Sequence, residues 1–188
     1  MSKMTENKTE THAQQCLVLI KPDGLVKSLT GNIITSLSET KLKIIGAKIV
    51  SVKKELAEAH YSELKQGMIR KFGETKGREV FESVLKYIQG EYHTNRVLAL
   101  VYQGENAIQR IRDIAGKTNP EEADPVSIRG RYGRINSKTG VMENVLHASD
   151  SEANAKREIQ LWFEPHELTE TVYLTKKQKI SVDKITWE

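Results

Sequence analysis

Cysteine is almost absent from this sequence, with Cys16 alone among 188 residues, so we expect no internal disulfide and a cytoplasmic protein. Long hydrophobic runs are absent too, and none approaches the ~20 residues that a transmembrane helix needs. The first residues, MSKMTENKTETHAQQ, contain no apolar segment of the kind found in signal peptides. The five histidines are scattered and one cysteine cannot complete a ligand set, so no side-chain metal site is predicted.

An excess of one charge is also missing, because 29 Lys and Arg residues face 25 Asp and Glu residues, for a net charge of +4. Such a mixed surface excludes a polycation that coats nucleic acid. Hydrophobic types make up 38% of the chain, which is enough for one sizeable core. Residues 1–14 are polar, and we expect them to form a disordered tail before a single domain.

Apolar patterns predict strands and helices that follow one another along most of the chain. The expected strands cover residues 16–20, 43–52, 97–102 and 141–146, and the expected helices cover residues 31–42, 56–64, 78–88, 107–114 and 151–163. This order is typical of an α+β, ferredoxin-like sandwich, a four-stranded antiparallel sheet with helices packed on one face. Prolines and glycines between residues 118 and 140 predict a long loop, and long loops inside compact domains are usually functional.

The first candidate for chemistry is His147, which ends an apolar segment just before a predicted helix. Ser149 and Glu152 have the spacing of a capping box, which would start that helix. Glu158 lies on the apolar face of the same helix, where a carboxylate needs a partner, and a ring nitrogen of His147 is a candidate. That contact would leave the other nitrogen as a nucleophile. The alternative is that His147 only packs or caps.

Three cations are candidates for phosphate binding. Lys21 ends the first expected strand beside a Pro-Asp-Gly turn, Arg112 is on the expected helix before the long loop, and Arg129 is within that loop. Each taken alone is expected to be a solvated surface charge, whereas together in one pocket they would bind a triphosphate. Thr118 offers a hydroxyl donor and Asn144 an amide for a sugar hydroxyl. Spacing in the sequence does not establish that these residues converge.

Five parts of the chain, in order, resemble the nucleoside diphosphate kinase family. They are CLVLIKPDG at 16–24, His60-Tyr61, GKTNP at 116–120 with SIRG at 127–130, NVLHASDS at 144–151, and KREIQLWF at 156–163. The resemblance implies a kinase domain over residues 15–168 and leaves residues 169–188 as a C-terminal extension that matches nothing.

The resemblance also implies a function. The γ-phosphoryl of a nucleoside triphosphate such as ATP would pass to a nucleoside diphosphate by a ping-pong mechanism through phosphohistidine at His147, with Mg²⁺ held by phosphates and water rather than by side chains. Ser149 and Glu158 would orient the histidine. The nucleotide or the phosphoryl group would be held by Lys21, Tyr61, Phe81, Arg112, Thr118, Arg129, Val141 and Asn144. Family resemblance further implies a homo-oligomer built on dimers, possibly a hexamer.

Three segments, residues 66–78, 90–96 and 131–143, are longer than in the common family pattern. The first makes the base-stacking aromatic ambiguous, and we choose Phe81 over Phe72. The main alternative is a ferredoxin-like module that binds RNA, but only 6% of residues are aromatic and the strands lack the stacking pattern such modules use. The other alternative is an inactive relative that serves as an interaction scaffold. The retained His147, Lys21, Arg112 and Arg129 argue against it.

Overall fold

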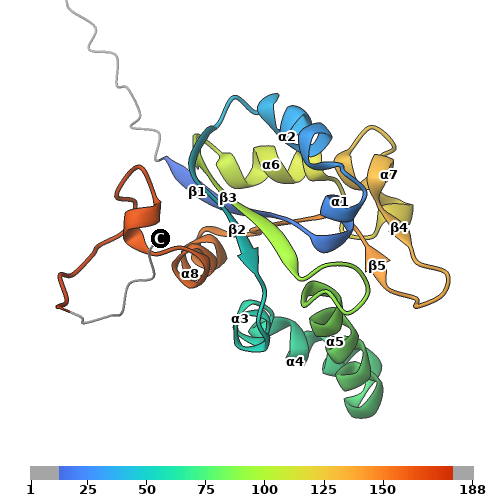
Figure 1. Ribbon diagram of the computed structural model, residues 1–188. Coiled ribbons are helices and arrows are strands. Elements are labelled where there is room, and N and C mark those ends of the chain that lie inside the picture. The colour runs from blue at the N-terminus through green and yellow to red at the C-terminus, as the bar shows by residue number, and fades with distance from the viewer. Residues whose placement is uncertain (1–12, 180–188) are drawn as a thin grey trace, which may run out of the picture.

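A four-stranded antiparallel sheet forms the centre of the protein in the computed structural model, which describes residues 13–179 (Figure 1). Its strands are β1 (Gln14–Ile20), β2 (Lys43–Ser51), β3 (Arg96–Gly104) and β6 (Leu146–Ala148), in the spatial order β2-β3-β1-β6. β1 pairs with β3 along its whole length and with β6 at its carboxyl end, where Leu19 lies opposite His147. This is the strand order of the predicted ferredoxin-like sandwich.

Helices cover both faces of the sheet, so the prediction of one covered face was wrong (Figure 1). Alternate residues of β1 point to opposite faces, and every one of them from Cys16 to Ile20 is fully buried, because each face has its own layer. One layer holds α2 (Thr30–Ser38) and α6 (Ala107–Ala115), and the other holds α3 (Lys54–His60), α5 (Glu74–Ile88) and α8 (Glu152–Trp162).

The remaining elements show where three of the expected segments differ from the structure. They are α1 (Pro22–Val26), α4 (Ser62–Phe72), η1 (Pro120–Glu122), α7 (Ile128–Tyr132), β4 (Arg134–Ile135), β5 (Met142–Glu143) and η2 (Pro165–Glu167). The helix expected over residues 56–64 breaks between α3 and α4, and the expected loop 118–140 contains η1, α7 and β4. The fourth strand predicted over 141–146 was misplaced, since β5 pairs with β4 in a separate hairpin and β6 completes the sheet.

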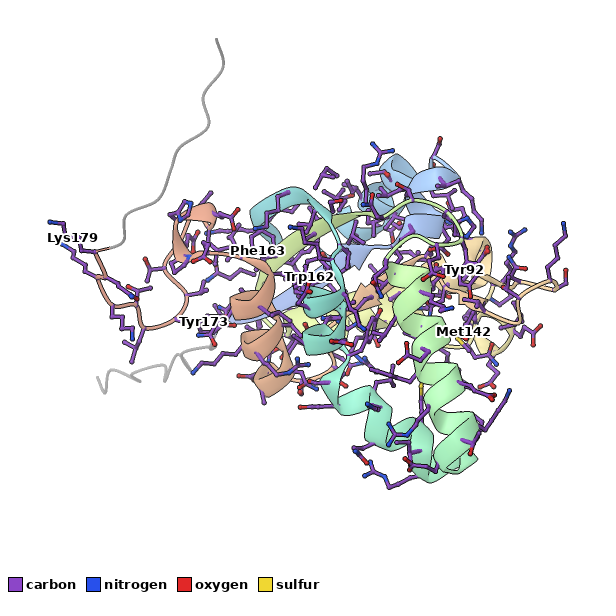
Figure 2. The ribbon with its side chains drawn as sticks, turned by 60° about the horizontal axis from the view of Figure 1, so that its bottom comes forward. Tyr92, Met142, Trp162, Phe163, Tyr173 and Lys179 are labelled. Carbon is purple, nitrogen blue, oxygen red and sulfur yellow. The ribbon has the colours of Figure 1, made fainter. Side chains whose placement is uncertain are left out.

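The segment after α8 returns to the edge strand of the sheet. The backbone N–H of Thr169 donates to the carbonyl oxygen of Ile45 in β2, at 2.8 Å. Tyr173 then packs against the core layer that contains α8 (Figure 2). No helix among residues 13–179 is long and apolar enough to span a membrane. Residues 1–12 of the expected tail lie outside the described residues, and so do residues 180–188 of the expected extension.

Candidate active site

His147, Glu158 and Ser149 form a hydrogen-bonded group where β6 meets α8. The His147 Nε2–H donates to Glu158 Oε2 at 3.1 Å, and the Ser149 hydroxyl donates to the same oxygen at 2.6 Å. Glu158 and Ser149 are buried, whereas 23% of the His147 side chain is exposed. Because Nε2 carries the hydrogen, Nδ1 carries a lone pair, and it has no hydrogen-bond partner among residues 13–179. The contact predicted between Glu158 and His147 is therefore present.

The capping-box pattern predicted that Ser149 starts the helix α8, and this prediction was wrong. The N-cap of α8 is Ser151, whose side chain accepts from the backbone N–H of Asn154 at 3.2 Å. Ser149 instead accepts a hydrogen bond from the backbone N–H of Leu17 in β1, at 3.1 Å. The hydroxyl thus ties the carboxylate of Glu158 to the central strand of the sheet.

The backbone just before His147 is strained. Val145 has φ = +57°, a left-handed conformation that costs a β-branched residue about 1–3 kcal/mol. Two hydrogen bonds hold it there, because its N–H donates to Asp23 Oδ2 at 3.0 Å and its carbonyl accepts from the Lys21 N–H at 2.9 Å. The strain and its supports fix the direction in which the chain enters β6.

Lys21 lies at the end of β1 with its amine directed at an amide rather than an acid. Its Nζ donates to Asn144 Oδ1 at 2.8 Å, and Asn144 Nδ2 donates to the carbonyl oxygen of Thr118 at 2.9 Å. The ring of Tyr87 lies 4.7 Å from the amine. Burial lowers the pKa of Lys21 to about 8, partly offset by the nearby charge of Asp23. No carboxylate forms an ion pair with this lysine within the described structure.

Arg129 comes from α7 and is also buried, with no acidic partner in the described part of the chain. Its two terminal nitrogens donate to the carbonyl oxygens of Gly116, at 2.6 Å, and Leu146, at 3.1 Å. Gly116 has φ = +82°, and a side chain there would meet the Ser127 hydroxyl at 2.2 Å, so only glycine fits. Burial lowers the pKa of Arg129 to about 10, and the charge of Arg112 adds to this.

The other predicted residues are placed less uniformly. Arg112 on α6 and Thr118 are exposed, and the Thr118 side chain has no hydrogen bond in the described structure. Val141 and Tyr61 are half-buried. Phe81 is 4% exposed and belongs to the core layer with α5 and α8, so it offers no open ring face on which a base could stack.

His60 is a residue that sequence reasoning passed over, although it is part of the His60-Tyr61 pair. It ends α3, and its ring packs edge to face against His147, with centroids 4.5 Å apart and planes at 80°. A ring nitrogen of each histidine and a carboxylate oxygen of Glu158 lie within 4.8 Å of one another. Two nitrogens and one oxygen suit Zn²⁺ better than Mg²⁺, and Glu158 already accepts two hydrogen bonds. We therefore expect no magnesium ligand here.

Beside the site, the buried carboxylate of Glu143 connects two of the segments that are longer than in the family pattern, residues 90–96 and 131–143. Glu143 is 1% exposed and accepts from four side chains: Lys27 Nζ at 2.9 Å, His93 Nε2 at 3.0 Å, Arg134 Nε at 2.7 Å and Asn136 Nδ2 at 2.8 Å. Figure 2 shows Tyr92 and Met142, which mark the two segments, on the same side of the molecule. Arg134 and Asn136 lie close to Glu143 in the sequence, where an acid is an obvious partner for the arginine, but nothing in the sequence pattern indicated Lys27 or His93 as partners in this Glu143 cluster.

The Glu143 carboxylate stays ionised well into the acid range. Burial alone would raise its pKa, but hydrogen bonds from Arg134, Asn136 and Lys27 and the charge of Lys27 lower the pKa far below its ordinary value. The next residue along the chain is Asn144, which holds the Lys21 amine. The cluster therefore fixes the backbone on which one polar group of the site is mounted.

Comparisons with known proteins point to one family. The family model described as nucleoside diphosphate kinase matches residues 14–168. A nucleoside diphosphate kinase of Staphylococcus carnosus is 41% identical over 156 residues, which cover 83% of this chain and 91% of the relative. Among solved structures, a nucleoside-diphosphate kinase of Borrelia burgdorferi, with vanadate and ADP bound as a transition-state mimic, is 32% identical with a TM-score of 0.71, and the match covers 88% of this chain and 93% of that one. An NDP kinase of Pyrobaculum aerophilum is 27% identical with a TM-score of 0.73, covering 85% of this chain and all of that one.

Proposed function

The chain belongs to the nucleoside diphosphate kinase family, and we propose that it moves the γ-phosphoryl of a nucleoside triphosphate to a nucleoside diphosphate through His147. One observation carries the role of His147. Glu158 accepts the Nε2–H, which leaves Nδ1 with a lone pair on a partly exposed ring. An exposed lone pair with cations close by is the arrangement that in-line attack on a phosphoryl group requires.

The reaction would proceed in two matched steps. Nδ1 attacks the γ-phosphorus, the N–P bond forms, and the bond to the bridging oxygen breaks, so that the nucleoside diphosphate leaves with that electron pair. A second nucleoside diphosphate then takes the phosphoryl group in the reverse sense. Because Glu158 fixes the tautomer and Ser149 fixes Glu158, the lone pair keeps its direction in both steps.

The cations would bind the phosphates. Lys21 and Arg129 are buried without acidic partners among residues 13–179, so their charge is available to a triphosphate, and Arg112 is exposed nearby. The cation-rich lining fits a nucleotide that brings its own Mg²⁺, which phosphates and water would hold and which would neutralise charge on the transferring group. Low selectivity for the base would follow if the base makes few polar contacts with the protein. Phe81, the residue predicted to stack on the base, is buried, whereas Phe72, the alternative, is exposed and Val141 is half-buried.

The finer predictions on assembly and location remain part of this proposal. We expect a homo-oligomer built on dimers, possibly a hexamer, and a cytoplasmic protein, as the single buried cysteine without a disulfide favours. We also retain residues 15–168 as the kinase domain. The comparisons do not favour the RNA-binding module or the inactive scaffold.

Labelled ATP tests the proposal. Incubation of the wild-type protein should give a labelled species that is acid-labile and base-stable, the behaviour of phosphohistidine, and the label should pass to added nucleoside diphosphate. His147→Ala should form no such species and transfer nothing, because no other side chain replaces its nucleophile. His166→Ala, on the exposed turn η2, is the matched control and should behave as wild type. Turnover near the wild-type rate in His147→Ala would show that the nucleophile is elsewhere.

A further inference from the structure

The ring of His60 is held in one tautomer by Trp162, which lies where α8 faces α3 (Figure 2). The indole Nε1–H donates to His60 Nδ1 at 3.2 Å. An indole nitrogen can only donate, so Nδ1 must supply the lone pair, and the hydrogen of a neutral imidazole is then on Nε2. His60 is 3% exposed, and burial lowers its pKa well below the ordinary value, which keeps the ring neutral.

The Nε2–H of His60 has no acceptor. Its nitrogen is buried and lacks a hydrogen-bond partner among residues 13–179. A buried donor without a partner is rare in proteins, because it loses its bonds to water and gains nothing in exchange. The polar neighbours of the ring include His147 and the carboxylate of Glu158, which already accepts from Ser149 and His147. The acceptor must therefore arrive with a ligand.

We propose that the His60 Nε2–H donates a hydrogen bond to an oxygen of the phosphoryl group while that group is transferred to and carried by His147. This inference rests on the proposed function. A phosphoryl oxygen is a strong acceptor, and it would reach the site only when the nucleotide or the phosphorylated histidine is present. Donors that are already oriented where charge develops stabilise a transition state without reorganising. Trp162 supplies that orientation. Tyr61 packs edge-on against the same His60 ring, with the two ring centroids 4.6 Å apart.

Two ring-preserving variants and a control separate this role from simple packing. His60→Phe keeps an aromatic ring but removes the donor, and Trp162→Phe keeps its ring but removes the group that fixes the tautomer. His166→Phe makes the same chemical change on an exposed turn. In single-turnover reactions with ATP, we expect His60→Phe to slow phosphorylation of His147 by about tenfold or more. Trp162→Phe should slow it less, His166→Phe should match wild type, and ADP affinity should stay within about twofold in all three.

Nitrogen-15 NMR of the histidine rings supplies a second readout, which needs no turnover. The wild-type spectrum should show the hydrogen of His60 on Nε2, and Trp162→Phe should show a mixture of tautomers. This measurement can overturn the inference even if His60→Phe does not fold. A hydrogen on Nδ1 in the wild type, or wild-type phosphorylation by folded His60→Phe, would overturn the inference. If wild-type His147 is never phosphorylated, the proposed function itself fails, whatever tautomer the spectrum shows.

Discussion

Replacing Glu143 with glutamine should destabilise this protein far more than the same change at an exposed ion pair. Glutamine keeps the shape of the side chain but removes the charge, and its NH₂ group faces donors rather than acceptors. The carboxylate is 1% exposed and has four donors within 3.0 Å. Breaking one partner of a buried ion pair costs about 3–5 kcal/mol in general.

The structure places the expected loss for Glu143→Gln at or just below the lower end of that range. The side chains of Lys27 and Arg134 are 27% and 57% exposed, so water can solvate both cations once the carboxylate is gone. The amide oxygen of glutamine can also still accept from Asn136 or His93. We therefore expect a loss of about 2–3 kcal/mol, which corresponds to roughly 5–10 °C in Tm for a chain of this size.

Urea unfolding at fixed protein concentration measures this difference, with Glu170→Gln as the matched control. Glu170 pairs with Lys43 on the surface, where both side chains are largely solvated, so the control should change stability by less than about 1 kcal/mol. Because folding lowers the pKa of Glu143 below its ordinary 4.5, the stability it contributes is present above that pH and is lost as the pH falls through the lower folded value. The gap between the wild type and Glu143→Gln should narrow in acid. A loss at pH 7 no larger than that of the control would refute the reasoning.

Three further predictions concern chemistry and assembly. Burial lowers the pKa of Lys21 to about 8, so its amine is charged below that pH and loses its charge above it. The value of kcat/KM should therefore fall as the pH rises through about 8. A flat profile from about pH 7 to about pH 10 would show that this amine does not bind substrate. Glu158→Gln should slow phosphorylation of His147 by about tenfold or more while leaving nucleotide affinity nearly unchanged, as stopped-flow and equilibrium titration can separate. Light scattering at micromolar concentration should report at least a dimer, and a strict monomer would contradict the proposed assembly.

The local parts of the fold could be predicted because their signals are local. The apolar run of β1, the helical spacing of α8 and the glycine after α6 each follow from short-range chemistry. The prediction that helices cover one face was wrong, although the run of buried residues in β1 already indicated a strand covered on both sides. The fourth strand was misplaced because Val141 and Leu146 read as one apolar segment, whereas the turn at Val145 divides them between a hairpin and the sheet.

The site was predicted where residues lie near one another in the sequence and missed where only the fold brings them together. Glu158 follows His147 by eleven positions, and helical periodicity was enough to propose their contact. Lys27 and Glu143 are 116 positions apart, and His60 and Trp162 are 102 apart. No periodicity relates such positions, so neither the contact of Lys27 with Glu143 nor the tautomer of His60 could be found without the sheet topology.

Two pairs of cations near the candidate site differ in their hydrogen-bond acceptors. The difference explains how the cation-bearing segment 131–143 can lie beside a proposed phosphate site. Lys21 and Arg129 donate to neutral oxygens, an amide and backbone carbonyls, so their positive charge is not cancelled locally. Lys27 and Arg134 instead share the carboxylate of Glu143, which neutralises much of their charge beside the hairpin. Uncompensated cations there would offer phosphate a second, unproductive place to bind. With Glu143 in place, the buried cations that have no acidic partner among the described residues are Lys21 and Arg129, and we expect these two to draw a triphosphate toward His147.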